Sequence, residues 1–178
     1  MLRRRWPWRG GRQGEADSSS PGDRPLVALV SLGTRPSFPS DRIRMWLVEY
    51  VRLLGLRCDD VTIDAGAMPR AGESAAWAEQ LAPRLDGADV VLLLRPQGPP
   101  EAWKVTDEMV KLACDAVRTR WAAKPFGEVV YTHRRLKVLD VPGPHDAWFR
   151  FRDRGSPWYP QDVVAAVGLR LRTLLERA

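Results

Sequence analysis

Four short runs of apolar residues alternate along the chain with longer segments of helical periodicity. The runs lie at residues 26–31, 61–64, 88–94 and 128–131, and the third is the strongest because Val and Leu fill it from Val90 to Leu94. Continuous apolar runs of this length are typical of parallel strands that are covered on both faces. The pattern therefore predicts four buried strands.

The segments between and after these runs repeat apolar residues every three or four positions, which indicates helices with one buried face. The first predicted helix carries its apolar face from Ile43 to Leu54 and stops at Gly55. Ser37 or Ser40 can cap its N-terminus, because a hydroxyl oxygen accepts a hydrogen bond from the free backbone N–H groups of the first turn.

Three more helices are predicted over about residues 74–86, 106–121 and 160–176. Thr106 is the expected N-cap of the middle one. Pro83 lies inside the first of the three and is expected to kink it or end it early, because proline cannot donate a helical hydrogen bond. Strands that alternate with helices in this way predict a mostly parallel sheet with helices on both faces.

One further segment does not fit the parallel pattern. Residues 136–141 alternate weakly between apolar and polar positions, but only residues 132–135 separate them from the fourth strand. A parallel crossover needs roughly a dozen residues or more. The segment therefore either forms an antiparallel hairpin with the fourth strand at the edge of the sheet or is not a strand, and we favour the hairpin.

Length and composition suit a single domain without a membrane span. The chain has 178 residues, and no apolar run approaches the roughly 18 residues that cross a bilayer. No apolar segment follows the charged N-terminus, so no secretory signal is predicted. Cys58 and Cys114 lie inside predicted elements and not in a C-x-x-C pair, which favours structural thiols in a reducing compartment and a cytoplasmic location.

Residues 1–24 differ in composition from the rest and are predicted to form a disordered tail, with the domain at 25–178. The tail holds six arginines and three acidic residues, and it therefore carries half of the net charge of +6. Its Gly, Ser and Pro content leaves too little apolar surface to offset the entropy of ordering. Trp6 and Trp8 lie beside arginines and could contact an anionic partner such as nucleic acid or a membrane surface. A solvated leader without a partner is the interpretation we favour.

Ligands of open parallel α/β sheets bind outside the carboxyl ends of the strands. The loop after the first strand combines a helix N-terminus, backbone N–H groups, one guanidinium and three hydroxyls, a combination that suits an anion. These side chains belong to Thr34, Arg35, Ser37 and Ser40. The loop has too few glycines for a Walker or dinucleotide fingerprint, and a plainly capped helix start is the alternative. The two histidines, His133 and His145, are too few and too far apart to indicate a metal site.

Several stretches between residues 26 and 131 carry recognisable motifs. The first loop reads L-G-T-R-P-S-F from residue 32, the third strand begins A-D and ends R-P-Q-G-P, and residues 110–115 read V-K-L-A-C-D. Residues 120–133 read R-W-A-A-K-P-F-G-E-V-V-Y-T-H. The chain thereby resembles the NAD(P)H-dependent FMN reductases, whose corresponding motifs are often G-S-T-R-P-G-R, A-D with T-P-E-Y-N, L-K-x-A-x-D and E-W-x-x-K-P-x-G-x-V-x-Y-G-G.

The resemblance implies a flavodoxin-like three-layer sandwich that binds FMN and uses NAD(P)H as co-substrate. By this resemblance, the FMN phosphate would be held by Thr34, Arg35, Ser37 and Ser40. The flavin ring would be bordered on one side by Pro96, Gln97 and Gly98, and on the other by Tyr131, Thr132 and His133. No catalytic residue is assigned, and a homodimer is left open.

The flavin loops depart from the family pattern. Only the proline of the T-P-E-Y-N loop is present, and Thr132 and His133 stand where glycines let the ring approach the backbone. The helix that normally follows this loop is missing from the pattern. The alternative function is therefore a flavin-free family member that acts as a non-catalytic accessory or partner-binding protein.

Overall fold

A computed structural model describes residues 24–34, 39–99, 101–132, 135–141, 143, 148–150 and 160–177. The predicted tail lies outside these residues apart from Arg24. The strands are β1 (Leu26–Thr34), β2 (Arg57–Asp64), β3 (Val90–Pro96), β4 (Phe126–Tyr131), β5 (Arg135–Val138) and β6 (Phe149–Arg150). The α-helices are α1 (Pro39–Leu53), α2 (Ser74–Leu85), α3 (Asp107–Arg120) and α4 (Pro160–Leu175), and two short 3-10 helices cover Ala65–Ala67 and Glu101–Trp103.

The described strands form one sheet in the order β2-β1-β3-β4-β5-β6. The first four are parallel, with Val30 of β1 opposite Leu93 of β3. β5 runs antiparallel to β4, with Val129 opposite Val138, which confirms the predicted hairpin. The connector is too short for a crossover, so the chain must turn back on itself.

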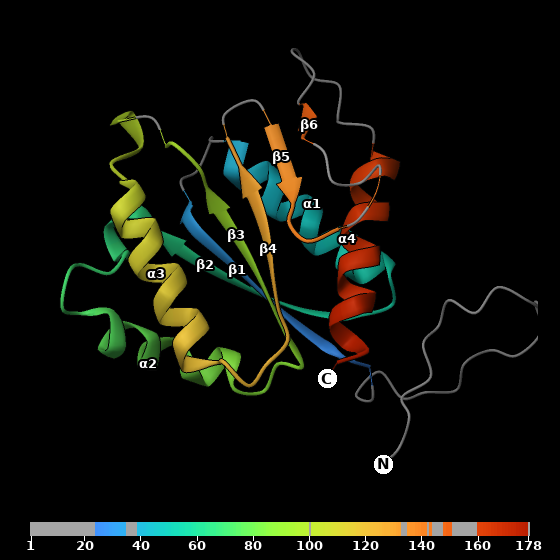
Figure 1. Ribbon diagram of the computed structural model, residues 1–178, viewed down its shortest axis with the longest axis horizontal. Coiled ribbons are helices and arrows are strands. Elements are labelled where there is room, and N and C mark those ends of the chain that lie inside the picture. Colours follow the sequence, from blue (N-terminus) through green and yellow to red (C-terminus); the bar gives the residue numbers. More distant parts are fainter. Residues whose placement is uncertain are drawn as a thin grey trace, which may run out of the picture.

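Helices cover both faces of the sheet (Figure 1). One buried cluster joins Val27 and Leu29 of β1 to α1 and α4, and a second joins Ala28 and Val30 of the same strand to α2 and α3. Successive strand residues point to opposite faces, and right-handed crossovers in opposite directions along the sheet put α1 and α2 on opposite sides. The protein is thus a mostly parallel α/β protein, compatible with a flavodoxin-like fold.

The helix predictions agree with the structure, while one strand is longer than its pattern. Thr106 caps α3 as expected, because its hydroxyl accepts a hydrogen bond of 3.2 Å from the Met109 N–H. Pro83 does not end α2 early, since the helix continues to Leu85. β2 begins at Arg57, before the predicted start. None of the helices in the described part of the chain is long and apolar enough to cross a membrane.

Candidate functional site

The candidate site lies at the carboxyl ends of β1 and β3, which are neighbours in the sheet. From β1 the chain passes to α1 on one face, and from β3 it passes to α3 on the other. A switch of this kind separates the two following loops and leaves a crevice at the strand ends of many open α/β sheets. The ends of β1 and β3 thus form the switch point at which the sequence predicts a ligand, and the site itself stays a prediction.

Of the four residues predicted to hold the phosphate, the structure describes the backbone of Thr34 and Ser40. Thr34 is the last residue of β1, and Ser40 lies in the first turn of α1. Arg35, Ser37 and the side chains of Thr34 and Ser40 lie outside the described part of the structure, as does His133 of the ring side. For these residues the structure therefore shows only the backbone at the end of β1 and in the first turn of α1, a helix of 15 residues.

The structure brings the first ring-side group next to the end of β4. Pro96 ends β3 and is paired with Tyr131 in the parallel register. The Gln97 N–H donates a 2.8 Å hydrogen bond to the Tyr131 carbonyl oxygen. The Gly98 N–H donates a 3.2 Å hydrogen bond to the Asp107 carboxylate, at a backbone φ of +56° that favours glycine. Both N–H groups are therefore already used within the protein.

Tyr131 itself is part of the core, with no exposed surface. Its hydroxyl lies 3.4 Å from the carbonyl oxygen of Leu32, and its ring centroid is 6.0 Å from that of Trp103. Thr132 closes the hairpin turn, because its N–H donates to the Arg135 carbonyl oxygen and its hydroxyl accepts from the Arg135 N–H. These two residues thus hold the strand ends together in this structure.

Two residues that sequence reasoning did not single out pack near the strand ends, Trp103 beside Tyr131 of β4 and Val105 beside Gly33 of β1. Trp103 is 5% exposed and Val105 is 3% exposed, although both belong to the connection between β3 and α3. A Cβ atom on Gly33 would lie 3.0 Å from Val105, so this connection packs directly on the end of β1. Lys104, between them, has an exposed side chain and a left-handed backbone with φ +54°. The only sequence signal was two large apolar residues in a loop.

Beside these loops lies a buried carboxylate. Glu128 of β4 is 4% exposed and accepts a 2.6 Å hydrogen bond from Arg95 at the end of β3. It also forms an ion pair with Arg118 of α3. Two cations around one buried carboxylate compensate its desolvation, so this cluster fixes β3, β4 and α3 relative to one another.

Neither cysteine offers a reactive thiolate. Both are free, and burial raises the pKa of Cys58 to about 12 and that of Cys114 to about 11. A thiol with a pKa this high stays protonated and is a poor nucleophile near neutral pH. Among the described residues no cluster of three or more His, Cys, Asp or Glu residues has the arrangement of a metal site.

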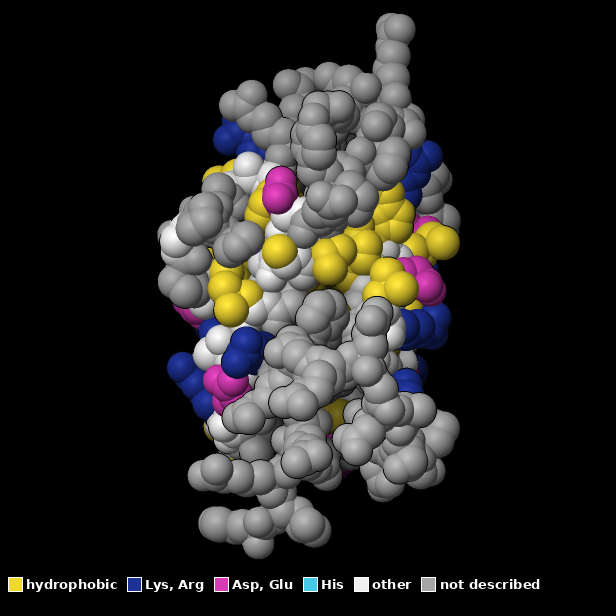
Figure 2. Space-filling model, turned by 90° about the vertical axis from the view of Figure 1, so that its right-hand side faces the viewer, with side chains coloured by type: hydrophobic (Ala, Val, Ile, Leu, Met, Phe, Trp, Pro, Cys, Tyr) yellow, Lys and Arg dark blue, Asp and Glu magenta, His cyan; other side chains and the backbone are white. Residues whose placement is uncertain are grey.

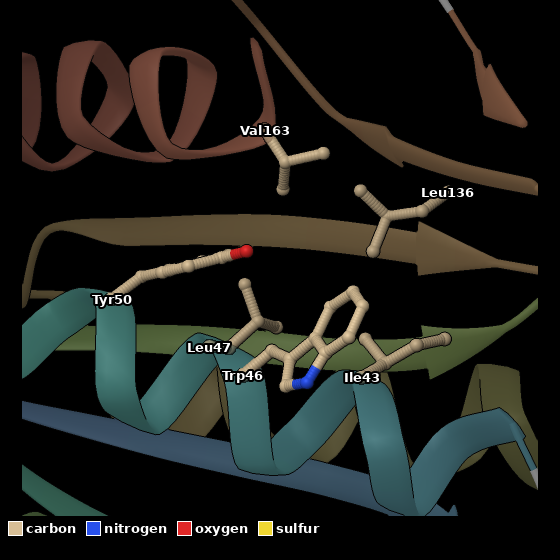
Figure 3. A pocket seen from close by; sticks show the side chains of 6 residues that line it. All are labelled: Ile43, Trp46, Leu47, Tyr50, Leu136 and Val163. Carbon is tan, nitrogen blue, oxygen red and sulfur yellow. The ribbon is translucent and has the colours of Figure 1, made fainter. Parts of the chain in front are cut away.

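Away from the strand ends, the side of the molecule shown in Figure 2 carries a band of apolar side chains across its middle. A narrow apolar crevice lies between α1, β5 and α4 (Figure 3). Its lining residues are Ile43, Trp46, Leu47, Tyr50, Leu136 and Val163. The crevice has no room for a water molecule, so it is a packing seam between elements and not a ligand site.

No protein-family model, no curated protein and no solved structure matches this chain. The fold therefore defines the class alone, a mostly parallel α/β protein compatible with a flavodoxin-like fold.

Proposed function

We propose that this chain is a flavodoxin-like three-layer protein of the NAD(P)H-dependent FMN reductase type. The observation that carries the proposal is the strand order β2-β1-β3-β4, in which the chain direction across the sheet reverses between β1 and β3. FMN occupies this position in proteins with the flavodoxin strand order. The motif resemblance between residues 26 and 131 points to the same ligand. Location in the cytoplasm is part of the proposal.

The phosphate end of FMN fits the residues at this edge. β1 ends at Thr34 and α1 begins at Pro39, so the positive end and free N–H groups of the helix follow closely after the strand in the chain. Thr34, Arg35, Ser37 and Ser40 would hold the phosphate, with Arg35 as the strongest single contact. Bound FMN would supply the hydride acceptor for NAD(P)H, and the protein would supply binding and orientation.

The ring end fits less well. The N–H groups of Gln97 and Gly98 are engaged within the protein, and Tyr131 is enclosed against Trp103. Donors that are already paired add little to a ligand, because a new hydrogen bond would replace an existing one. FMN would therefore be held mainly through its phosphate, and we expect binding in the micromolar range or weaker.

The same packing favours a second candidate function. If Trp103 and Val105 keep the strand ends closed, the protein binds no flavin and serves as a non-catalytic accessory or partner-binding protein. Their exposures of 5% and 3% are the specific observation behind this alternative.

A titration with FMN, followed by flavin fluorescence, separates the two candidates. The wild type should bind weakly, and Arg35→Ala should weaken binding about 10- to 100-fold, since a hydrogen bond to a charged group contributes about 1.5–3 kcal/mol. Tight binding that Arg35→Ala leaves unchanged would refute the phosphate assignment. No binding by either protein up to roughly millimolar FMN would favour the flavin-free function.

A further inference from the structure

A second hollow lies on the other side of β1 from the candidate FMN site, where β2 ends and α2 begins. It has a volume of about 400 Å³ and lies between the loop after β2 and one face of α2. Its main lining residues are Met68, Arg70, Glu73, Ala76, Trp77 and Gln80. Positions 73, 76, 77 and 80, at the start of α2 and within it, are spaced three or four residues apart, as expected for one face of a helix. The volume lies within the range of roughly 300–1,000 Å³ that is typical of small-molecule sites.

The floor of this hollow is apolar and fixed. Trp77 is 8% exposed and Met68 is 5% exposed. The Trp77 indole N–H donates a 2.8 Å hydrogen bond to the carbonyl oxygen of Ala67, which ties α2 to the loop across the base of the hollow. The Glu73 N–H bonds the Arg70 carbonyl oxygen at 3.0 Å and fixes the rim in the same way. The hollow is thus formed before any ligand binds.

The rim carries one cation, one anion and one amide. Within the described part of the chain, the side chains of Arg70, Glu73 and Gln80 have no hydrogen bond or ion pair. Arg70 and Glu73 have opposite charges and share a turn, yet they do not pair with each other. Other opposite charges at this spacing in the molecule do pair, as Glu49 and Arg52 do at 3.0 Å. The two charges at the rim therefore remain available to a ligand.

We propose that this hollow binds a small zwitterion with an apolar body, of the class of free α-amino acids. Arg70 would bind the carboxylate, Glu73 would bind the ammonium group, and the side chain of the ligand would lie on Trp77 and Met68. The net charge of the two rim groups is zero, which matches a zwitterion better than a simple anion or cation. This inference does not depend on the proposed FMN site.

The test is an NMR titration of the full chain with L-phenylalanine, compared with 3-phenylpropionate, which lacks the ammonium group, and phenethylamine, which lacks the carboxylate. L-Phenylalanine should bind most tightly and shift the amide signals of residues 66–80. Arg70→Gln should weaken L-phenylalanine and 3-phenylpropionate about tenfold, and Glu73→Gln should weaken L-phenylalanine and phenethylamine by a similar factor. Glu79→Gln, on the same helix but outside the hollow, should leave all three unchanged.

Two results would overturn the proposal as a whole, and a third would refute the recognition of both charges. One is the absence of localised chemical-shift changes with L-phenylalanine up to about 10 mM, which would mean that the binding free energy is weaker than about 3 kcal/mol. The other is binding that neither Arg70→Gln nor Glu73→Gln weakens, while both variants keep the wild-type spectrum outside residues 66–80. Equal affinity for all three compounds would likewise refute recognition of both charges.

Discussion

Among the described glycines for which a Cβ meets a neighbour, Gly127 of β4 has the closest contact. An alanine Cβ there would lie 2.8 Å from Leu174 Cδ1 and 3.2 Å from Leu92 Cδ1. Leu174 is 2% exposed and Leu92 is 1% exposed, so neither side chain can move toward solvent. Overpacking of this kind costs about 1–3 kcal/mol. The smaller entropy of the unfolded alanine chain offsets about 0.4–1 kcal/mol of it.

Gly127→Ala should therefore lower the free energy of unfolding by about 1–2 kcal/mol. For a domain of this size, the midpoint of thermal unfolding should fall by about 2–8 °C, because each kcal/mol corresponds to about 2–4 °C. Circular dichroism gives this midpoint. Urea unfolding should show a lower midpoint with the same m-value, as expected when stability changes but the exposed surface does not.

Gly87→Ala is the matched control. A Cβ at Gly87 meets no atom within 4 Å, and its backbone is not left-handed. This variant should be stabilised by about 0.4–1 kcal/mol through the unfolded state alone. The double variant Gly127→Ala/Leu174→Val should lose less stability than the sum of its single changes, because the clash is relieved. If Gly127→Ala proves as stable as Gly87→Ala, α4 does not pack on β4 as described.

Three further predictions concern the core and the tail. Burial raises the pKa of Cys114 from 9.0 to about 11. The protonated thiol should therefore contribute folding stability below pH 9, and this contribution should be lost as the pH rises toward 11. Labelling of the Cys114 thiol should be slow until the protein unfolds. Glu128→Gln should lower the free energy of unfolding by about 1–2 kcal/mol, because Arg95 and Arg118 lose a buried partner but keep access to water; unchanged urea unfolding would contradict this. Deletion of residues 1–24 should leave the thermal midpoint nearly unchanged, and a loss equivalent to roughly 1 kcal/mol or more would show that the tail packs on the domain.

Much of the fold could be predicted from the sequence because apolar periodicity reports burial directly. The four parallel strands were found as apolar runs, and the hairpin of β4 and β5 followed from the length of its connector. The start of β2 was missed because Asp59 and Asp60 are polar. At the edge of the sheet these carboxylates form ion pairs with Arg84 and Arg44, and such pairs leave no trace in an apolar pattern.

The candidate site was only partly predictable. The strand pattern predicted that Pro96, Gln97 and Gly98 follow β3, and the structure shows them beside the end of β4. That a ligand binds there stays a prediction. The burial of Trp103 and Val105 in the connection between β3 and α3 was not foreseen, since a loop has no periodicity from which burial can be inferred. Loop packing depends on contacts between segments far apart in the sequence, such as Val105 with Gly33.

The most direct test of the account is a comparison of FMN with riboflavin, which lacks the phosphate, by equilibrium dialysis against the purified full chain. Because the ring-side N–H groups are engaged and the phosphate-side loop adjoins the start of α1, FMN should bind in the micromolar range or weaker. Riboflavin should bind at least about tenfold more weakly than FMN. Equal affinity for the two flavins, or no binding of FMN up to roughly millimolar concentration, would contradict the proposal that this sheet edge binds FMN through its phosphate.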